Sequence, residues 1–286
     1  MDVSWNEISK EMLFHYYCEK LMSDQEIATL FGVTRSQVSY KRRYLKVFRK
    51  ESAKANASVY QDRILGCLRV LGLSRLMWDP ERHNELNRLL HVPFQCCKAH
   101  PEYRPIRISS FGNLLACSIE LSYPDSFDKM QRLLSMLVQE YLGHYGYMLR
   151  GAVTIGRLYH DERLICGPAF IKAQRLEKNL ARYPRIILKA QDLRLGLSAC
   201  PAERRAHMKQ KFILDRDGFY YLDGFYGSKR ERENILLKRA KENLDKIPYE
   251  SGREKEKVDW LKQELERHNT EVSPGPFPSS YALEEG

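Results

Sequence analysis

The sequence predicts an α+β protein made of an N-terminal three-helix unit, a central sheet domain and a pair of C-terminal helices. Three helix-capping patterns follow one another within the first fifty residues. Between Val59 and Tyr226, apolar runs with β-branched residues alternate with amphipathic helical patterns. After Ser228 the pattern is helical again, with dense mixed charge that is typical of a solvated surface. We therefore expect domains at 1–56, 57–227 and 228–270, followed by a disordered tail at 271–286 that is rich in Pro and Ser.

The first fifty residues have the pattern of a helix-turn-helix. Their capping boxes are Ser4-x-x-Glu7, Ser23-x-x-Glu26 and Thr34-x-x-Gln37. The boxes predict one helix over 8–20, a short second helix, and a basic third helix from 35 to about 49. Gly32 supplies the left-handed residue that ends the second helix. Two short helices joined through a glycine turn are the helix-turn-helix signature. Lys41 departs from the pattern, because its position on the inner face of the third helix is usually apolar.

The third helix is the expected partner of double-stranded DNA. From Thr34 to Lys54 there are eight Lys and Arg residues against one acid, Glu51, and neutralising phosphates requires such a positive field. A helix-turn-helix lays its second helix in the major groove. The side chains expected to point outward there are Thr34, Arg35, Ser36, Ser39, Tyr40 and Arg43. A helical adaptor that binds protein is the alternative interpretation. The stretch resembles the homeodomain-like helix-turn-helix of bacterial regulators and recombinases.

The central region predicts strands and helices in the order βαββαβ, with later additions, which favours a ferredoxin-like antiparallel sheet. A first strand is expected within 63–73, and a hairpin around Gly112-Asn113. A long helix follows over 125–145. A strand from Leu149 then meets a turn at Gly156 and His160-Asp161-Glu162. The expected later elements are a helix from Pro168 to before Tyr183-Pro184 and strands at 185–188, 212–214 and 219–223.

The segment Tyr147–Leu188 resembles the class III nucleotidyl cyclase catalytic domain, in particular bacterial cyclase-like relatives of unknown role. In that family, a strand of the type RxGIxxG leads through a hairpin to a helix carrying N-x-A-x-R-L. The helix here reads Ile171-Lys172-Ala173-Gln174-Arg175-Leu176. The resemblance places Arg175 on the arginine that contacts the transferring phosphate, and Ile171 in place of the asparagine that orients the ribose. It covers roughly residues 60 to 225, and a K-x-x-W-L pattern at 257–261 extends it.

The resemblance also implies two metal-binding aspartates, and neither is present. One belongs in the hairpin, where Asn113 stands. The other belongs in the first strand, where two registers are possible: Gly66 as the family glycine puts Arg63 at that position, and Gly72 puts Arg69 there. An arginine places a cation where Mg²⁺ would need a carboxylate. Two unit charges about 4 Å apart interact with roughly 4 kcal/mol at an effective dielectric near 20, and a divalent ion doubles the repulsion.

We therefore expect a centre with no catalytic residues, metal or cofactor. Arg69, Asn113 and Arg175 are candidates for a metal-free site for nucleotide phosphate, because guanidinium suits phosphate. The alternative is that Arg63 and Arg69 are arginines on a solvated face, for example that of a helix. A residual nucleotidyl cyclase activity is a further hypothesis that rests on the fold resemblance alone.

Global properties agree with a polyanion partner and an intracellular protein. The net charge is +10, the isoelectric point is near 9.2 and hydrophobic residues make up 43% of the chain. No apolar run reaches the roughly 20 residues of a membrane span, and the N-terminus does not resemble a signal peptide, so a cytoplasmic location is expected. Seven cysteines then predict free thiols. Cys96-Cys97 with His100 lacks the paired spacing of zinc sites, and no P-loop, dinucleotide-binding or Ser-His-Asp pattern is found.

Together these features predict a DNA-binding transcription regulator or defence-type sensor. The cyclase-like domain would serve dimerisation or ligand sensing. Because class III cyclases build their sites across a dimer, the resemblance also implies a homodimer.

Overall fold

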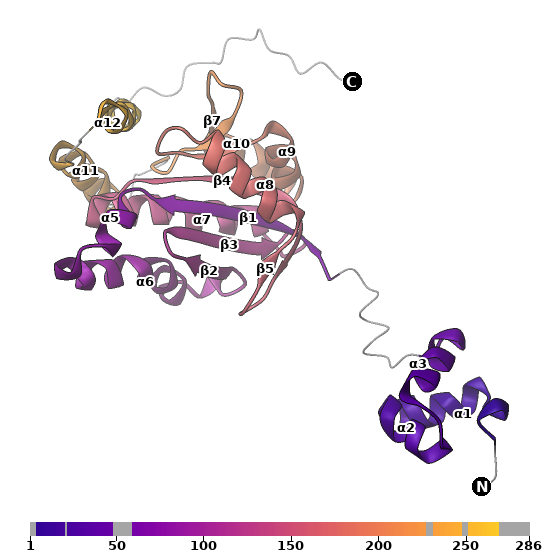
Figure 1. Ribbon diagram of the computed structural model, residues 1–286. Helices are drawn as coiled ribbons and strands as arrows, with labels where there is room; N and C mark the ends of the chain where they lie inside the picture. Colours follow the sequence, from indigo (N-terminus) through magenta and orange to yellow (C-terminus); the bar gives the residue numbers. More distant parts are fainter. Residues whose placement is uncertain (1–3, 21, 48–58, 227–230, 248–250, 269–286) are drawn as a thin grey trace. The chain divides into compact units, whose positions relative to one another are not determined.

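The computed structural model describes residues 4–20, 22–47, 59–226, 231–247 and 251–268. The chain divides into two compact units, Met1–Val59 and Tyr60–Gly286, which are drawn in Figure 1 and are described separately below. The tail expected at 271–286 lies outside the described residues.

The first unit is built from helices around a small apolar core. Its elements are the 3-10 turn η1 (Trp5–Glu7), α1 (Lys10–Phe14), the π-helical turn η2 (His15–Glu19), α2 (Asp24–Phe31) and α3 (Arg35–Tyr44). The Ser23 and Thr34 capping boxes form as predicted, and Gly32 ends α2 with a φ of 64°. The core residues are Ile8, Leu13, Ile27, Ala28, Val38 and Val47.

Two helix ends in this unit differ from the sequence prediction. Ser9, and not Ser4, caps α1: its hydroxyl accepts the N–H of Met12 at 3.3 Å. Ser4 instead precedes the separate turn η1. The third helix ends at Tyr44 and not near residue 49, because Lys46 adopts a φ of 53°. The N–H of Val47 then bonds the carbonyl of Arg42, which closes the helix and lets Val47 enter the core.

The second unit contains one mixed sheet. Its strands are β1 (Gln61–Val70), β2 (Arg107–Phe111), β3 (Leu114–Glu120), β4 (Leu149–His160), β5 (Ile165–Cys166), β6 (Ile186–Leu188), β7 (Phe212–Leu214) and β8 (Tyr220–Leu222). The strand order is β2-β3-β1-β4-β6-β8-β7, and β5 pairs only with β4. The first four strands pair antiparallel in the ferredoxin-like order. The expectation of an antiparallel sheet fails beyond them, because β6 follows the crossover helix and pairs parallel to β4.

Helices cover both faces of this sheet. The helical elements between the strands are α5 (Leu73–Met77), η3 (Pro80–Arg82), α6 (His83–Ala99), η4 (Pro101–Tyr103), α7 (Ser126–Gln139), η5 (Glu140–His144), α8 (Pro168–Asn179), α9 (Ala190–Ser198) and α10 (Ala202–Lys209). Alternate residues of β1 separate the two layers: Ile64 and Leu68 join the large core with α6 and α7, whereas Leu65 and Cys67 pack against α8. In Figure 1, α8 lies in front of β1 and α7 behind it.

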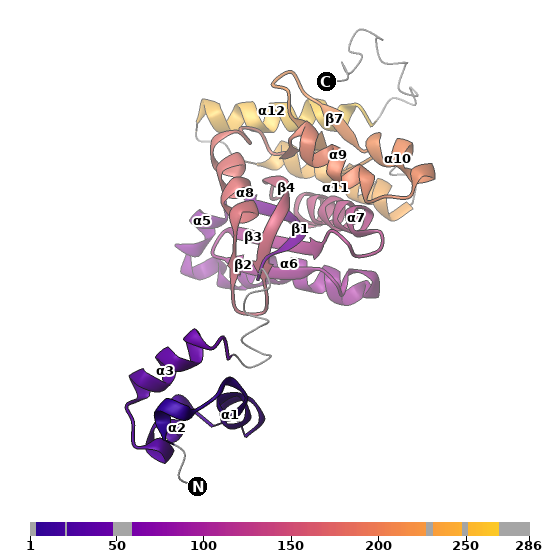
Figure 2. The same ribbon diagram turned by 90° about the vertical axis from the view of Figure 1, so that its right-hand side faces the viewer.

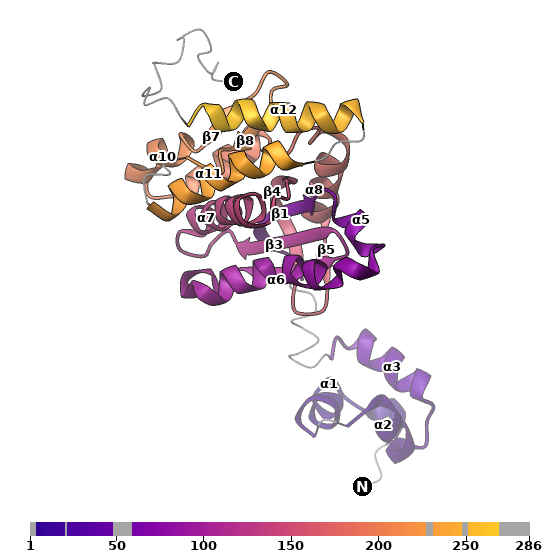
Figure 3. The same ribbon diagram turned by 90° about the vertical axis from the view of Figure 1, so that its left-hand side faces the viewer.

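Two C-terminal helices, α11 (Glu231–Lys246) and α12 (Gly252–Glu266), complete the unit and lie side by side in Figures 2 and 3. They share a core with Leu142, Met148 and Phe225. The helix expected over 125–145 has the right extent, but its last part is the π-helical turn η5. A Cβ at Gly143 would lie 3.0 Å from the backbone of Leu236, so the missing side chain lets α11 approach η5 closely.

Candidate functional sites

The outward surface of α3 carries the residues expected to bind DNA. Thr34, Arg35, Ser36, Tyr40 and Arg43 are exposed, and Ser39 is half-buried. The hydroxyl of Thr34 is engaged in the cap with Gln37.

The cations of α3 fall into two groups. Arg42 faces inward and pairs with Asp24 of α2 at 3.0 Å, which fixes the angle between the two helices. Arg35, Arg43 and Lys46 form no ion pair with any described residue, so their charges face solvent. The surface of α3 therefore keeps a positive charge that is not neutralised within the unit.

Lys41, which broke the expected apolar pattern, is explained by its contacts. Its ammonium group donates a hydrogen bond to the carbonyl of Trp5 and lies 4.9 Å from the centroid of the Trp5 ring. The hydrocarbon part of the lysine thus packs at the edge of the core, and its charge is stabilised by the indole face and a carbonyl. Lys41 therefore joins η1 to α3.

A cluster of five polar side chains lies where β1 ends, and it contains Arg69 and Asn113. Arg69 donates from Nη1 to Asn113 Oδ1 at 2.6 Å, and from Nε and Nη2 to the two carboxylate oxygens of Glu177 at 2.9 and 3.2 Å. Arg150 of β4 donates from Nε to the same carboxylate at 2.8 Å. Asn113 also donates to Ser74 at 2.9 Å. Both strand arginines are thereby tied to the one carboxylate on α8.

The geometry selects one of the two registers considered for the first strand. Arg69 contacts Asn113, whereas Arg63 lies at the other end of β1, bonded to Ser118 and Glu120. The register with Gly72 as the reference glycine is therefore the one that brings the two positions together. The alternative of arginines on a solvated helix face is wrong, because both belong to a strand and Arg63 is buried. The side chain of Arg69 is 28% exposed and points to Glu177.

Arg175 does not join this cluster. It is exposed on α8 and forms no hydrogen bond or ion pair with the described residues. Glu177 is 1% exposed, and residues two apart on a helix point in nearly opposite directions. Arg175 instead shares its side of α8 with Ile171, four residues earlier, which is 52% exposed. The structure therefore brings together Arg69 and Asn113, but not Arg175.

Sequence reasoning missed Glu177 as the carboxylate that Arg69 binds, and Arg150 as the second arginine that binds it. Glu177 occurs in the apolar helical pattern of α8, at a position that faces the sheet. An acid on such a face needs a buried cation as its partner. That requirement is the signal that could have identified the arginines of β1 and β4 from the sequence. Two guanidinium groups share one carboxylate here, so the cluster carries an excess positive charge and is arranged unfavourably for a divalent cation.

A second polar cluster surrounds His160, which lies in β4 and not in the expected turn. Ser118 accepts a hydrogen bond from Arg63 Nε at 2.9 Å, and its Oγ lies 2.7 Å from His160 Nδ1. His160 Nε2 lies 2.9 Å from Ser109 Oγ. Burial, reinforced by Arg63 and Arg107, lowers the pKa of His160 to about 4. The neutral ring therefore donates to one serine from one nitrogen and accepts from the other serine at the other nitrogen.

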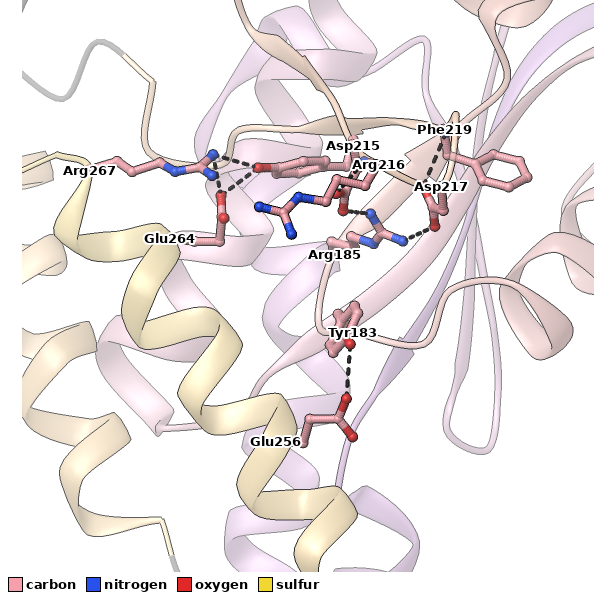
Figure 4. A network of polar contacts seen from close by, with 10 residues as sticks. Tyr183, Arg185, Asp215, Arg216, Asp217, Phe219, Glu256, Glu264 and Arg267 are labelled. Carbon is pink, nitrogen blue, oxygen red and sulfur yellow. Dashed lines mark hydrogen bonds and ion pairs between the residues drawn. The ribbon is translucent and has the colours of Figure 1, made fainter.

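A third network joins α12 to the sheet, as Figure 4 shows. Arg185 is 2% exposed and its guanidinium group binds Asp215 and Asp217. The rings of Tyr183, Tyr221 and Trp260 lie 5.7 to 5.9 Å from its central carbon. Tyr183 also donates to Glu256 of α12 at 2.9 Å. Both terminal nitrogens of Arg185 are paired, whereas its buried Nε has no hydrogen-bond partner among the described residues. The network holds α12 in place.

The adjacent cysteines Cys96 and Cys97 do not have the exposure or the lowered pKa of reactive thiols. Cys96 is buried and Cys97 is half-buried, and burial raises the pKa of the Cys97 thiol to about 11. Within the described ranges, no three His, Cys, Asp or Glu side chains gather in a way that could hold a metal ion. None of the helices in these ranges is long and apolar enough to cross a bilayer.

Comparison with known proteins found similarity to solved structures alone. No family model matches the chain, and neither does any curated protein. Among solved structures, a bacterial light-regulated adenylyl cyclase is 16% identical with a TM-score of 0.42, over 64% of this chain and 58% of that one. The monomeric guanylyl cyclase domain of the RhoGC fusion protein from the aquatic fungus Blastocladiella emersonii is 11% identical with a TM-score of 0.41, over 57% and 95%. The adenylyl cyclase CyaB from P. aeruginosa is 12% identical with a TM-score of 0.37, over 57% and 94%.

These three structures are adenylyl or guanylyl cyclases. This chain spans less than two thirds of the light-regulated cyclase. The likeness is one of fold alone, and function is inferred below from the residues of this chain.

Proposed function

We propose that the protein is a DNA-binding regulator or defence-type sensor whose cyclase-like domain serves dimerisation or ligand sensing and not turnover. The observation that carries the DNA part is the surface of α3. It presents Arg35 and Arg43 without acidic partners among the described residues, beside the polar side chains of Ser36, Ser39 and Tyr40. Arg and Ser side chains in this arrangement suit base edges and phosphates of duplex DNA.

A mobility-shift assay with duplex fragments from the host genome tests this proposal. The double variant Arg35→Ala/Arg43→Ala should bind about ten-fold or more weakly, because each lost arginine contact costs about 1–3 kcal/mol. The matched control is Arg104→Ala/Arg157→Ala, which removes the same charge from exposed positions in the other unit. Equal binding by the parent and the α3 variant would show that the assigned surface is wrong.

The absence of turnover is proposed from the Arg69 cluster. A two-metal mechanism needs carboxylates that gather divalent ions beside the transferring phosphate. The two positions that the cyclase resemblance assigns to them hold Arg69 and Asn113, which bond each other at 2.6 Å. Glu177, the carboxylate beside them, already accepts three hydrogen bonds from two arginines. A divalent ion would have to displace these bonds and face two cations.

Incubation with each labelled nucleoside triphosphate and Mn²⁺ tests the turnover claim. We expect no cyclic product, and formation of a cyclic product would establish the alternative, a nucleotidyl cyclase. Ligand sensing is tested separately by calorimetry with nucleoside triphosphates and cyclic nucleotides in EDTA. Heat that is lost in Arg175→Ala would support a metal-free nucleotide site, and no heat at all would leave dimerisation as the role of the domain.

The proposed homodimer has a simple readout. Light scattering should report twice the 33.6 kDa of one chain. A mass of one chain at micromolar concentration would remove dimerisation from the proposal.

A further inference from the structure

Tyr44 was not among the residues expected to bind DNA, yet it is one of the most exposed aromatic side chains of α3. Tyr44 is 75% exposed and Tyr40 is 74% exposed. Their rings are stacked, with centroids 6.5 Å apart and an interplanar angle of 10°, because residues four apart on a helix are neighbours. Two large, parallel, solvent-facing rings form an apolar surface of the kind that marks an interaction site.

The two rings line an open groove between η1 and α3. The other lining residues are Trp5, Asn6, Ser36, Gln37 and Lys41. The bonds of Lys41 to the carbonyls of Trp5 and Asn6 hold the two walls together. The groove is therefore formed before any partner arrives, which lowers the entropic cost of binding.

The polar groups of the groove are oriented toward a partner that accepts hydrogen bonds. Gln37 Oε1 accepts from the backbone N–H of Thr34 at 2.8 Å and from its hydroxyl at 2.9 Å. The amide NH₂ of Gln37 is thereby turned away from the cap, and it donates to no described residue. Beside the groove, Arg43 lies three residues after Tyr40 on the same side of α3 and adds a positive charge without an acidic partner among the described residues. The charges thus select a polyanion as the occupant.

We propose that this groove binds one sugar–phosphate strand of DNA, beside the surface with which α3 reads the major groove. The faces of Tyr40 and Tyr44 would pack against deoxyribose, and Asn6, Ser36 and Gln37 would donate to phosphate oxygens. The inference rests on the proposed DNA binding and adds a second contact strip to it. Tyr44 is assigned as a positioning residue, because a sugar contact carries no sequence information.

Such a contact has a distinctive energetic signature. A neutral side chain releases no counterions, so its loss should leave the dependence of log Kd on log salt unchanged. Loss of a phosphate-bound arginine such as Arg43 should instead reduce that slope by about one. Loss of a sugar contact should also weaken all sequences equally, whereas loss of a base contact should weaken only some.

Fluorescence anisotropy with the full chain tests this, using two unrelated duplexes across a series of salt concentrations. Tyr44→Ala should weaken binding roughly ten-fold, or about 1.4 kcal/mol, on both duplexes. Its plot of log Kd against log salt should stay parallel to that of the parent. Tyr44→Phe should bind like the parent, because the ring faces make the contact. The matched control is Leu30→Ala on α2, which removes another exposed apolar side chain (54% exposed) from the same unit. A hydroxyl-radical footprint, which reports on deoxyribose, should lose protected positions in Tyr44→Ala alone.

The outcomes separate this inference from the function on which it rests. If the parent chain binds no duplex, the proposed function and the inference both fall. If the parent binds and Tyr44→Ala binds equally well, only the inference falls. A loss restricted to one duplex, or a changed salt slope, would assign Tyr44 to base reading or to charge placement and would overturn the sugar contact. Circular dichroism melting of each variant verifies that the exposed substitution leaves the helices intact.

Discussion

At the scale of single residues, the hydrogen-bond partners of a side chain decide what it can do. His160 lies near two serines, which in sequence terms suggests catalysis. Its two ring nitrogens bond Ser118 and Ser109, and burial with the nearby Arg63 lowers the pKa of the ring. The histidine is therefore held neutral and serves to connect β4 with β2 and β3.

The lowered pKa of His160 predicts a pH-dependent stability. The folded protein protonates this ring only near pH 4, whereas the unfolded chain does so near 6.5. The contribution of the neutral His160 ring to the free energy of unfolding is fully present above pH 6.5. It is lost as the pH falls from 6.5 through 4, because the unfolded chain binds the extra proton. Urea unfolding should show a drop in the free energy of unfolding of up to about 3 kcal/mol across this range. His160→Gln should flatten this slope and His83→Gln, at an exposed position, should retain it; the same slope in all three proteins would refute the assignment.

Glu177 provides a second test at this scale. Glu177→Gln keeps the shape of the side chain but leaves Arg69 and Arg150 facing each other without a counter-charge. Breaking a buried ion pair in this way costs about 3–5 kcal/mol, so the melting temperature should fall by several degrees. Glu162→Gln, at an exposed position of the β4–β5 turn, is the control and should melt like the parent. An unchanged melting temperature in Glu177→Gln would mean that the cluster contributes little.

At the scale of elements, local sequence patterns identified most helices and strands but not how each one ends or pairs. The capping boxes at Ser23 and Thr34 act within four residues, and both form as predicted. The end of α3 depends on Val47 entering the core and on a left-handed Lys46, which composition does not reveal. The parallel pairing of β6 and the partners of Arg69 arise from contacts across more than a hundred positions or across a crossover helix. No local period encodes such contacts.

Which candidate-site residues could be predicted also depended on whether their contacts are local in the sequence. The outward-facing residues of α3 were predictable because α3 is one helix with a known period. The proximity of Arg69 and Asn113 followed from a resemblance, and the structure places them in contact. The groove beside Tyr44 could not be predicted from the period of α3, because η1 forms its other wall.

The attachment of α12 gives the prediction at this scale. Trp260 stacks on Tyr183 with ring centroids 5.3 Å apart, and the central carbon of Arg185 lies 5.9 Å from the centroid of the Trp260 ring. Trp260→Ala should remove about 3–5 kcal/mol from the docking of α12. Hydrogen exchange should then rise across 252–266 while β1 and β4 stay protected. Trp78→Ala, at a position 88% exposed, is the control. Uniformly raised exchange would instead show that α12 unfolds only with the whole unit.

At the scale of the whole molecule, charge is strongly segregated along the first unit. Residues 1–33 contain six acids and two bases, whereas 34–54 contain eight bases and one acid. The two parts of the unit thus carry opposite net charges. An approaching polyanion is attracted to α3 and repelled by the acidic residues of 1–33.

This segregation predicts steered association with DNA. The association rate constant in stopped-flow experiments should fall steeply between about 50 and 200 mM salt. Arg43→Ala should lower the association rate constant by a larger factor than it changes the dissociation rate constant. Arg104→Ala, which removes one charge from the other unit, should change both rate constants little. An association rate that is insensitive to salt would contradict the electrostatic account.

The link from Arg69 to Glu177 also limits how this domain could change in later generations. An aspartate at position 69 would set two anions side by side and remove a cation that Glu177 depends on. That single substitution would be less stable than the present sequence. A divalent-cation site at this position therefore requires several coordinated substitutions, so the ion pair restricts which chemistries the domain can evolve.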